Sequence, residues 1–187
     1  MDELREKIGS LLEPDMFLDT SDVFRDEGSI RGMTFPDVTD DRVFGYMTRL
    51  TMSDFMDKDK QAEMRKIIDH ATDSKIVIFG YGASLVWDEP DLMVYADMAR
   101  WEIQRRMRKN RVDNLGIRNK SESTEKKYKR GFFVDWRVCD RLKKKTVHKW
   151  DYVLDTNDED QPKMATASAV LAGIGQAAHQ PFSVVPF

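Results

Sequence analysis

The sequence lacks the features that mark secreted and membrane proteins. Its single cysteine, Cys139, rules out an internal disulfide, which agrees with a reducing compartment, and is expected to be a small buried packing residue. No run of about 18 apolar residues is present to span a membrane. The start MDELREKIGSLLEP has neither the basic nor the apolar region of a signal peptide. We therefore expect a cytoplasmic protein with no membrane role.

Motifs for metal and nucleotide chemistry are also missing. The histidines His70, His148 and His179 have neither i,i+4 pairing nor a nearby cysteine pair, so no metal site is predicted. No glycine is followed by lysine, which excludes a Walker A phosphate loop, and no G-x-S-x-G motif occurs. Gly80 and Gly82 in FGYGAS form only part of a dinucleotide fingerprint. They favour a tight turn after a strand, with a phosphate-binding loop as the alternative.

Charged residues are abundant but unevenly distributed. The formal net charge is -3, yet residues 100–149 hold 18 of the 30 Lys and Arg and only 6 of the 33 Asp and Glu. This segregation predicts a basic surface that faces phosphate, a nucleotide, nucleic acid or an acidic partner domain. Nucleic acid is the least favoured, because the aromatic residues of this segment have helical spacing typical of a core and the chain as a whole is negative.

Hydrophobic periodicity predicts an α/β protein. Residues 1–38 are expected to be an acidic, irregular segment that contains one amphipathic helix near its start. The expected strands and helices beyond it are strands at 75–80, 91–97 and 150–157 and helices at 53–71, 98–111, 131–145 and 163–179. Their alternation predicts a three-layer domain over residues 39–187 with a mostly parallel sheet. Residues 111–130 have almost no apolar content and are predicted to form a mobile basic loop.

Candidate site residues lie at strand ends and in the basic segment. Ligands of open α/β sheets bind beyond the carboxyl ends of the strands, where Gly80, Asp97 and Asp155 are expected. Asp97 is a candidate general base or Mg²⁺ ligand, or else the cap of the next helix, whereas Asp155 is favoured as a turn residue. The candidate phosphate-binding residues are Gly80, Gly82, Arg105, Arg108, Arg130 and Arg137. A solvated helix face explains the arginines equally well.

Several segments together resemble the N-terminal region of the bacterial class I mannose-6-phosphate isomerases, from about Thr39 to Phe187. The segments are TDDRVFGYM, FGYGASL, YADMARWEIQRRMR, KYKRGFFVDWRVCDRLKKK, DYVLDTN, PKM and PFSVVPF. In that family this region precedes a zinc-dependent cupin domain of carbohydrate metabolism. The resemblance implies that the cupin, with its zinc ligands, would begin after Phe187.

The same region is similar to P-loop small-molecule kinases of the nucleoside-kinase type. That similarity implies a basic lid at 111–130 and a nucleotide ligand with Mg²⁺. The lid arginines it implies are Arg105, Arg108, Arg111 and Arg130. Two departures are the missing Walker A loop and Phe79, which stands where such kinases often carry a catalytic acid.

These observations predict a kinase-like accessory domain of an isomerase-like protein. It would bind a sugar phosphate or nucleotide, or dock the cupin, and would not be catalytic by itself. One alternative is a divergent small-molecule kinase with Asp97 as its catalytic residue. Another is a purely structural interaction domain.

Overall fold

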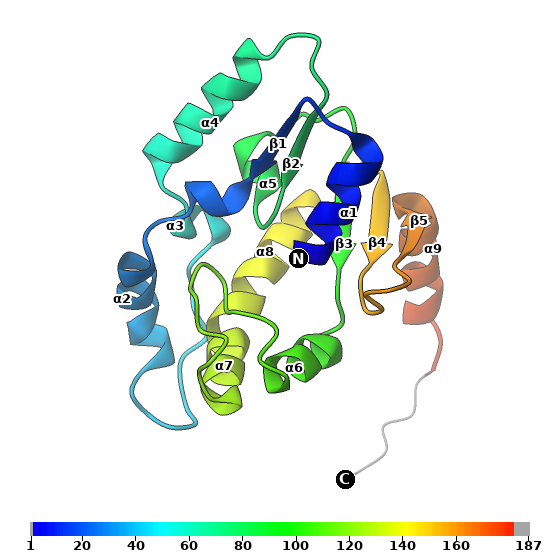
Figure 1. The fold of residues 1–187 in the computed structure, drawn as a ribbon. Helices are drawn as coiled ribbons and strands as arrows, with labels where there is room; N and C mark the ends of the chain where they lie inside the picture. Colours follow the sequence, from blue (N-terminus) through cyan, green and yellow to red (C-terminus); the bar gives the residue numbers. More distant parts are fainter. Residues whose placement is uncertain (1, 182–187) are drawn as a thin grey trace. The chain divides into compact units, whose positions relative to one another are not determined.

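The computed structural model describes residues 2–181 of the 187-residue chain as helices joined by short strands and turns (Figure 1). The chain divides into two compact units. The first unit comprises Met1–Pro90 and Arg100–Val147, and the second comprises Asp91–Ala99 and His148–Phe187. Both units contain strands and helices, so a mixed α/β composition is confirmed. The mostly parallel sheet predicted for residues 39–187 is not found among the described residues, because the strands form a two-stranded parallel sheet and a separate three-stranded mixed sheet.

Helices make up most of the first unit. In chain order they are α1 (Asp2–Leu12), α2 (Glu27–Val38), α3 (Met52–Phe55), α4 (Lys58–His70), α5 (Ala83–Val86), α6 (Arg100–Arg108), α7 (Thr124–Arg130) and α8 (Trp136–Thr146), with a 3-10 turn η1 (Thr20–Val23) and a π turn η2 (Gly131–Asp135). The strands β1 (Met16–Asp19) and β2 (Ile76–Phe79) pair in parallel, and Asp19 lies opposite Phe79. Their carboxyl ends therefore lie at the same edge of this small sheet. A further 3-10 turn, η3 (Val147–Lys149), contains the boundary between the units.

Much of residues 2–38 has regular structure, although the sequence pattern indicated an irregular 1–38 segment. The expected N-terminal helix is present as α1, and β1 and α2 follow it. At the start of α2, the Asp26 carboxylate accepts a hydrogen bond of 2.9 Å from the Ser29 N–H. Glycines and Pro36 weaken the helical pattern of α2, but Ile30 is fully buried. Packing of this side chain thus outweighs the low helix propensity of its neighbours.

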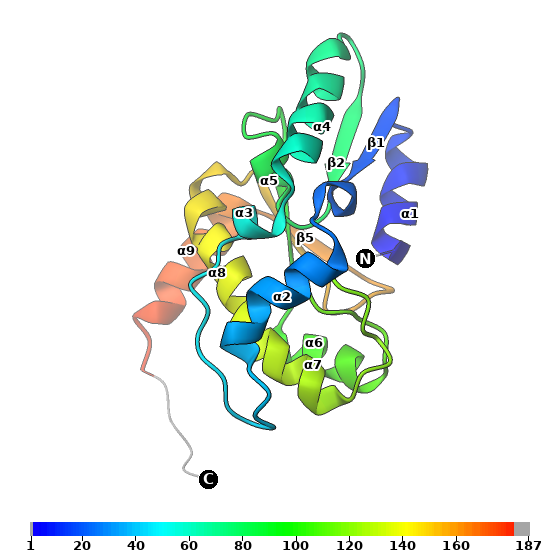
Figure 2. The same ribbon diagram turned by 90° about the vertical axis from the view of Figure 1, so that its left-hand side faces the viewer.

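A long helix with a π turn in its middle dominates the second half of the first unit. α7, η2 and α8 follow one another without a break (Figure 2). Within the π turn, the Trp136 N–H donates to the Gly131 carbonyl five residues earlier. Part of the predicted basic loop 111–130 belongs to this helix, because the last seven residues of the predicted loop form α7. The expected helix at 131–145 corresponds to η2 and α8.

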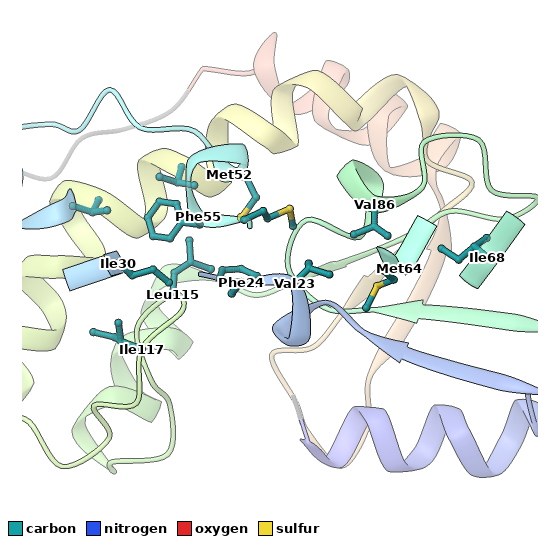
Figure 3. Packing of buried hydrophobic residues seen from close by; sticks show 13 residues of the cluster. Val23, Phe24, Ile30, Met52, Phe55, Met64, Ile68, Val86, Leu115 and Ile117 are labelled. Atoms are coloured by element: carbon teal, nitrogen blue, oxygen red, sulfur yellow. The ribbon is translucent and has the colours of Figure 1, made fainter. Parts of the chain in front are cut away.

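The rest of the predicted loop contributes to the hydrophobic core. Leu115 and Ile117 are buried in the cluster that also contains Phe24 and Ile30 (Figure 3). Gly116 between them has a φ of +71°, and a Cβ at this position would lie 2.6 Å from Ile30 Cδ1. The remaining buried members of the cluster are Val23, Met52, Phe55, Met56, Met64, Ile68, Val86, Val134 and Val138. Part of the 111–130 segment is therefore packed against the core, although its composition predicted a mobile basic loop.

The second unit is a three-stranded sheet with one helix. Its elements are β3 (Val94–Asp97), β4 (Tyr152–Asp155), β5 (Lys163–Thr166) and α9 (Ala167–Ala178). β3 and β4 are parallel, and β5 adds to β4 in the antiparallel direction. The helix expected at 163–179 thus begins later, after Thr166, whose hydroxyl accepts a 3.4 Å hydrogen bond from the Ala169 N–H. None of the helices within residues 2–181 is long and apolar enough to cross a bilayer.

Candidate functional site

The arginines predicted to bind phosphate have separate partners. On α6, the Arg105 guanidinium lies 2.9 Å from the Glu102 carboxylate, which also accepts a 3.0 Å bond from Arg106. Arg108 lies over the ring of Trp101, 5.5 Å from its centroid. The interactions of Arg105 and Arg108 are thus made within their own helix. They do not form the converging clamp that the sequence suggested.

Arg130, another predicted phosphate ligand, is buried. Its Nε lies 3.0 Å from Asp135 Oδ1, and its Nη2 donates to the Leu115 carbonyl at 3.1 Å. Only 6% of Arg130 and 7% of Asp135 is exposed to solvent. The guanidinium therefore neutralises an internal carboxylate, and the prediction that Arg130 contacts phosphate is corrected.

The π turn explains how Arg130 and Asp135 meet. In a regular α-helix, residues five positions apart point about 140° away from each other. The i→i+5 spacing of a π turn brings such residues to the same side of the helix. Residues 131–135 form this turn, so the extra residue in the helix places the Asp135 carboxylate beside the guanidinium.

Lys127 is fully buried and fixes the segment before α7. Its ammonium group donates hydrogen bonds to the Met107 carbonyl at 2.7 Å, to Asn110 Oδ1 at 2.7 Å and to the Lys120 carbonyl at 2.8 Å. All three donors of the ammonium group are thereby satisfied. The composition of the basic segment gave no sign of this internal role.

Two buried asparagines extend the network around Asp135. Asn114 Nδ2 donates to Asp135 Oδ2 at 2.6 Å, and Asn119 Nδ2 donates to Asn114 Oδ1 at 2.8 Å. Burial raises the pKa of Asp135, and Arg130 and Asn114 oppose this change by stabilising the carboxylate. The network is internal and polar, and we assign it the role of holding residues 107–120 against the long helix.

Arg100 and Arg137 form a pair of arginines whose side chains are partly exposed to solvent. Arg100 Nη2 lies 2.5 Å from Asp140 Oδ2, and Arg137 Nη2 lies 3.8 Å from the same oxygen. Two positive groups therefore share one carboxylate. The Arg137 Nε atom is buried and has no acceptor among the described residues. This arrangement leaves positive charge and an unused donor on the α6–α8 side of the first unit.

Aromatic rings hold both guanidiniums of this pair. Arg100 lies over Trp136, 5.4 Å from the ring centroid, and Arg137 lies over Phe132, 5.7 Å from its centroid. The two rings pack edge to face with centroids 6.3 Å apart. Such cation–π contacts restrict the side chains and keep their charge near the surface. Arg137 was predicted from the sequence, whereas Arg100 was not.

The predicted glycines serve the turn after β2. Gly80 and Gly82 have φ angles of +123° and +76°. A Cβ on Gly80 would collide with the Thr20 hydroxyl, and one on Gly82 would lie 2.9 Å from Met52 Cγ. The Thr20 hydroxyl in turn donates to the Tyr81 carbonyl at 2.9 Å. These contacts agree with the tight-turn interpretation, because they require glycine for close packing.

Asp97 and Asp155 are neighbours at the carboxyl ends of β3 and β4 in the second unit. They are Cα partners in the parallel β3–β4 pair, so their side chains project from the same face. The Asp97 carbonyl accepts bonds from the Thr156 N–H and hydroxyl, and Asp155 Oδ1 accepts a 2.9 Å bond from the Asn157 N–H. Asp155 therefore organises the predicted turn. Among residues 2–181, no three His, Cys, Asp or Glu side chains are grouped so as to hold a metal ion.

Cys139 lies on α8 beside the hydrophobic core. Burial raises the pKa of its thiol to about 12, and the negative charges of Asp135 and Asp140 add to this effect. The thiol is therefore protonated at neutral pH. This state fits the packing role that was expected for the residue.

The chain belongs to a protein family described as a domain of unknown function (DUF8485), whose profile matches residues 1–179. No curated protein and no solved structure matches the chain.

Proposed function

We propose that this member of the DUF8485 family is a non-catalytic, kinase-like accessory domain that binds a phosphate-containing ligand. The ligand would be a nucleotide or a sugar phosphate, as the resemblance to the N-terminal region of class I mannose-6-phosphate isomerases implies. The observation that carries the proposal is the convergence of Arg100 and Arg137 on the Asp140 carboxylate. A reaction is not proposed, because the sequence contains no Walker A loop.

The chemistry of the pair supports phosphate as the ligand class. Guanidinium groups present paired N–H donors that match the oxygens of phosphate, and such charge-assisted hydrogen bonds are stronger than neutral ones. Asp140 balances only one of the two positive charges. A phosphate group could supply the missing negative charge.

A thermal-shift screen tests the proposed binding. The 187-residue protein is heated with ATP, GTP, mannose 6-phosphate or fructose 6-phosphate, with and without Mg²⁺. A ligand present at about 100 times its Kd stabilises the native state by roughly 3 kcal/mol, which raises the Tm by about 5–10 °C. The rise should disappear in an Arg100→Ala, Arg137→Ala variant and persist in Arg118→Ala. No rise with any of the four ligands would contradict the proposal.

Docking of a catalytic cupin is a second candidate function, and it is supported by the apolar surface of the second unit. Leu171 and Ile174 are three residues apart on α9 and are 41% and 59% exposed, and Met164 on β5 is 61% exposed. Exposed apolar side chains three residues apart on one helix, such as Leu171 and Ile174, favour a protein contact. Sedimentation with a purified cupin domain from this isomerase family tests the idea. Association should be lost in Ile174→Asp and kept in Arg137→Ala, and no association of the parent chain would contradict it.

A further inference from the structure

A surface formed by residues 35–50 of the first unit, here called the 35–50 surface, carries large apolar side chains that are exposed to water. Their exposed fractions are 59% for Phe35, 61% for Val43, 73% for Phe44, 69% for Tyr46 and 49% for Met47. Single exposed apolar residues are common, whereas exposed apolar side chains that form one patch are a feature of binding surfaces.

Hydrogen bonds hold this surface in one conformation. The Asp41 carboxylate accepts bonds from the N–H groups of Val43 and Phe44 at 2.7 and 2.6 Å. The Thr39 hydroxyl donates to the Phe44 carbonyl at 3.0 Å, and the Lys129 ammonium donates to the Asp41 carbonyl. The loop is therefore fixed by its polar groups while its apolar side chains remain outside. A surface that is ordered before binding loses little conformational entropy on association.

Backbone contacts at the far end of the loop complete this support. The Tyr46 N–H donates to the Asp37 carbonyl at 2.7 Å, and the Thr48 N–H donates to the Phe133 carbonyl at 3.0 Å. Gly45 lies so close to α2 that a Cβ there would be 2.5 Å from the Asp37 carbonyl oxygen. The loop thus rests on α2 and on the long helix.

A cavity of about 500 Å³ opens beside these apolar side chains. Its lining residues are Asp37, Tyr46, Met47, Arg49, Leu50 and Asp54. Asp54 already accepts hydrogen bonds from the N–H and hydroxyl of Thr51. Within residues 2–181, Asp37 and Arg49 form no ion pair with each other or with another side chain. The cavity therefore offers two carboxylates, those of Asp37 and Asp54, and one guanidinium beside an apolar wall.

We propose that a second copy of this chain covers the 35–50 surface in a two-fold symmetric dimer. In a two-fold interface the same patch occurs on both subunits, so the patch must be complementary to itself. The 35–50 surface meets this condition because it carries an apolar centre and opposite charges at its side. Arg49 of one copy would pair with the partner's Asp37, and the Phe44 side chains of both copies would lie near the two-fold axis.

Charge is the reason to choose a second copy over a different partner. A partner whose contact surface carries charge of only one sign would neutralise either Asp37 or Arg49. The other residue would then lie near a desolvated interface without a counter-charge, which is unfavourable. A second copy supplies both counter-charges at once. The exposed face of α9, formed by Leu171 and Ile174, has no comparable pair, so the proposal does not extend to it.

Sedimentation equilibrium of the purified chain over about 1 to 100 µM tests the dimer. We expect a mass of twice 21.8 kDa at the upper concentrations. Phe44→Asp should weaken the dimer at least roughly 30-fold, as loss of a central contact does. Ile67→Asp is the matched control, since it places the same charge on an exposed apolar residue of α4, and it should leave the dimer intact.

Charge reversal makes the test specific to the proposed pairing. Arg49→Asp alone and Asp37→Arg alone should each weaken the dimer, because like charges would face each other across the axis. The variant with both changes should regain most of the parent affinity. A parent chain that stays monomeric at about 100 µM would overturn the proposal, and so would a double variant no better than the single ones. Circular dichroism of each variant verifies that it is folded, and the outcome is independent of the proposed phosphate site.

Discussion

Arg130 and Asp135 form a buried ion pair with an Nε–Oδ1 distance of 3.0 Å, and they do so across a π turn in the long helix of the first unit. This ion pair shows that the basic segment is not entirely a binding surface for anions. Part of its positive charge is used inside the protein, where it holds residues 107–120 in place. The charge that remains accessible on α6 and α8 includes Arg100 and Arg137.

Arg130→Ala should lower the free energy of unfolding by about 3–5 kcal/mol, because it leaves the Asp135 carboxylate buried without its counter-charge. Urea denaturation followed by circular dichroism measures the effect. Arg118→Ala, which removes an exposed guanidinium from the same segment, should change stability by less than about 0.5 kcal/mol. Equal losses of unfolding free energy in the two variants would show that the buried pair contributes no more to stability than an exposed arginine does.

Lys127→Met should loosen residues 107–120 selectively. The substitution keeps the length of the side chain but removes the donor from the carbonyls of Met107 and Lys120 and from Asn110 Oδ1. Hydrogen–deuterium exchange should therefore become faster in this segment and change much less in α4. Unchanged protection of residues 107–120 would mean that apolar packing alone holds them.

Native Cys139 should react slowly with a disulfide reagent such as DTNB. Its pKa of about 12 leaves roughly a thousandth of the thiolate that an ordinary cysteine has near pH 8. Because the chain has one cysteine, the absorbance change reports this residue alone. In about 6 M guanidinium chloride the reaction should be complete within seconds to minutes. Rapid reaction of the native protein would contradict the buried, protonated thiol.

Asp54 should contribute stability that is lost in acid. The hydrogen bond from the Thr51 N–H holds the pKa of Asp54 below its ordinary value of 3.8. The folded state therefore binds the proton more weakly than the unfolded state. The contribution is present above pH 3.8 and declines as the pH falls through the folded pKa. Between about pH 5 and pH 2.5, Asp54→Asn should lose less stability than the parent chain, and an equal loss in the two proteins would contradict this role of Asp54.

The sequence predicted elements whose signals are local. The run KIVIFG gave β2, and the helical spacing of Met64 and Ile68 gave the helix that is observed as α4. The Asp57 carboxylate accepts bonds from two N–H groups at the start of α4. Such patterns are readable because each depends on residues within one or two turns of one another.

Features that depend on distant residues were not predictable from the pattern. Arg100 and Asp140 are 40 positions apart, and only the packing of α6 near α8 brings them together. The burial of Lys127 was missed because a lysine in a polar stretch is normally solvated. The π turn was also not predicted, since such single-turn insertions into α-helices are rare.

Isothermal titration with inorganic pyrophosphate of the parent chain, Arg137→Ala and Asp140→Asn is the most direct test of the proposed phosphate site. We expect Arg137→Ala to bind at least about 10-fold more weakly than the parent, since a charge-assisted hydrogen bond is lost. Asp140→Asn should bind about 5-fold more tightly or better, because a carboxylate that repels the anion is removed. Equal affinity of the three proteins, or no binding by the parent at millimolar pyrophosphate, would contradict the assignment of Arg100 and Arg137 as a phosphate site.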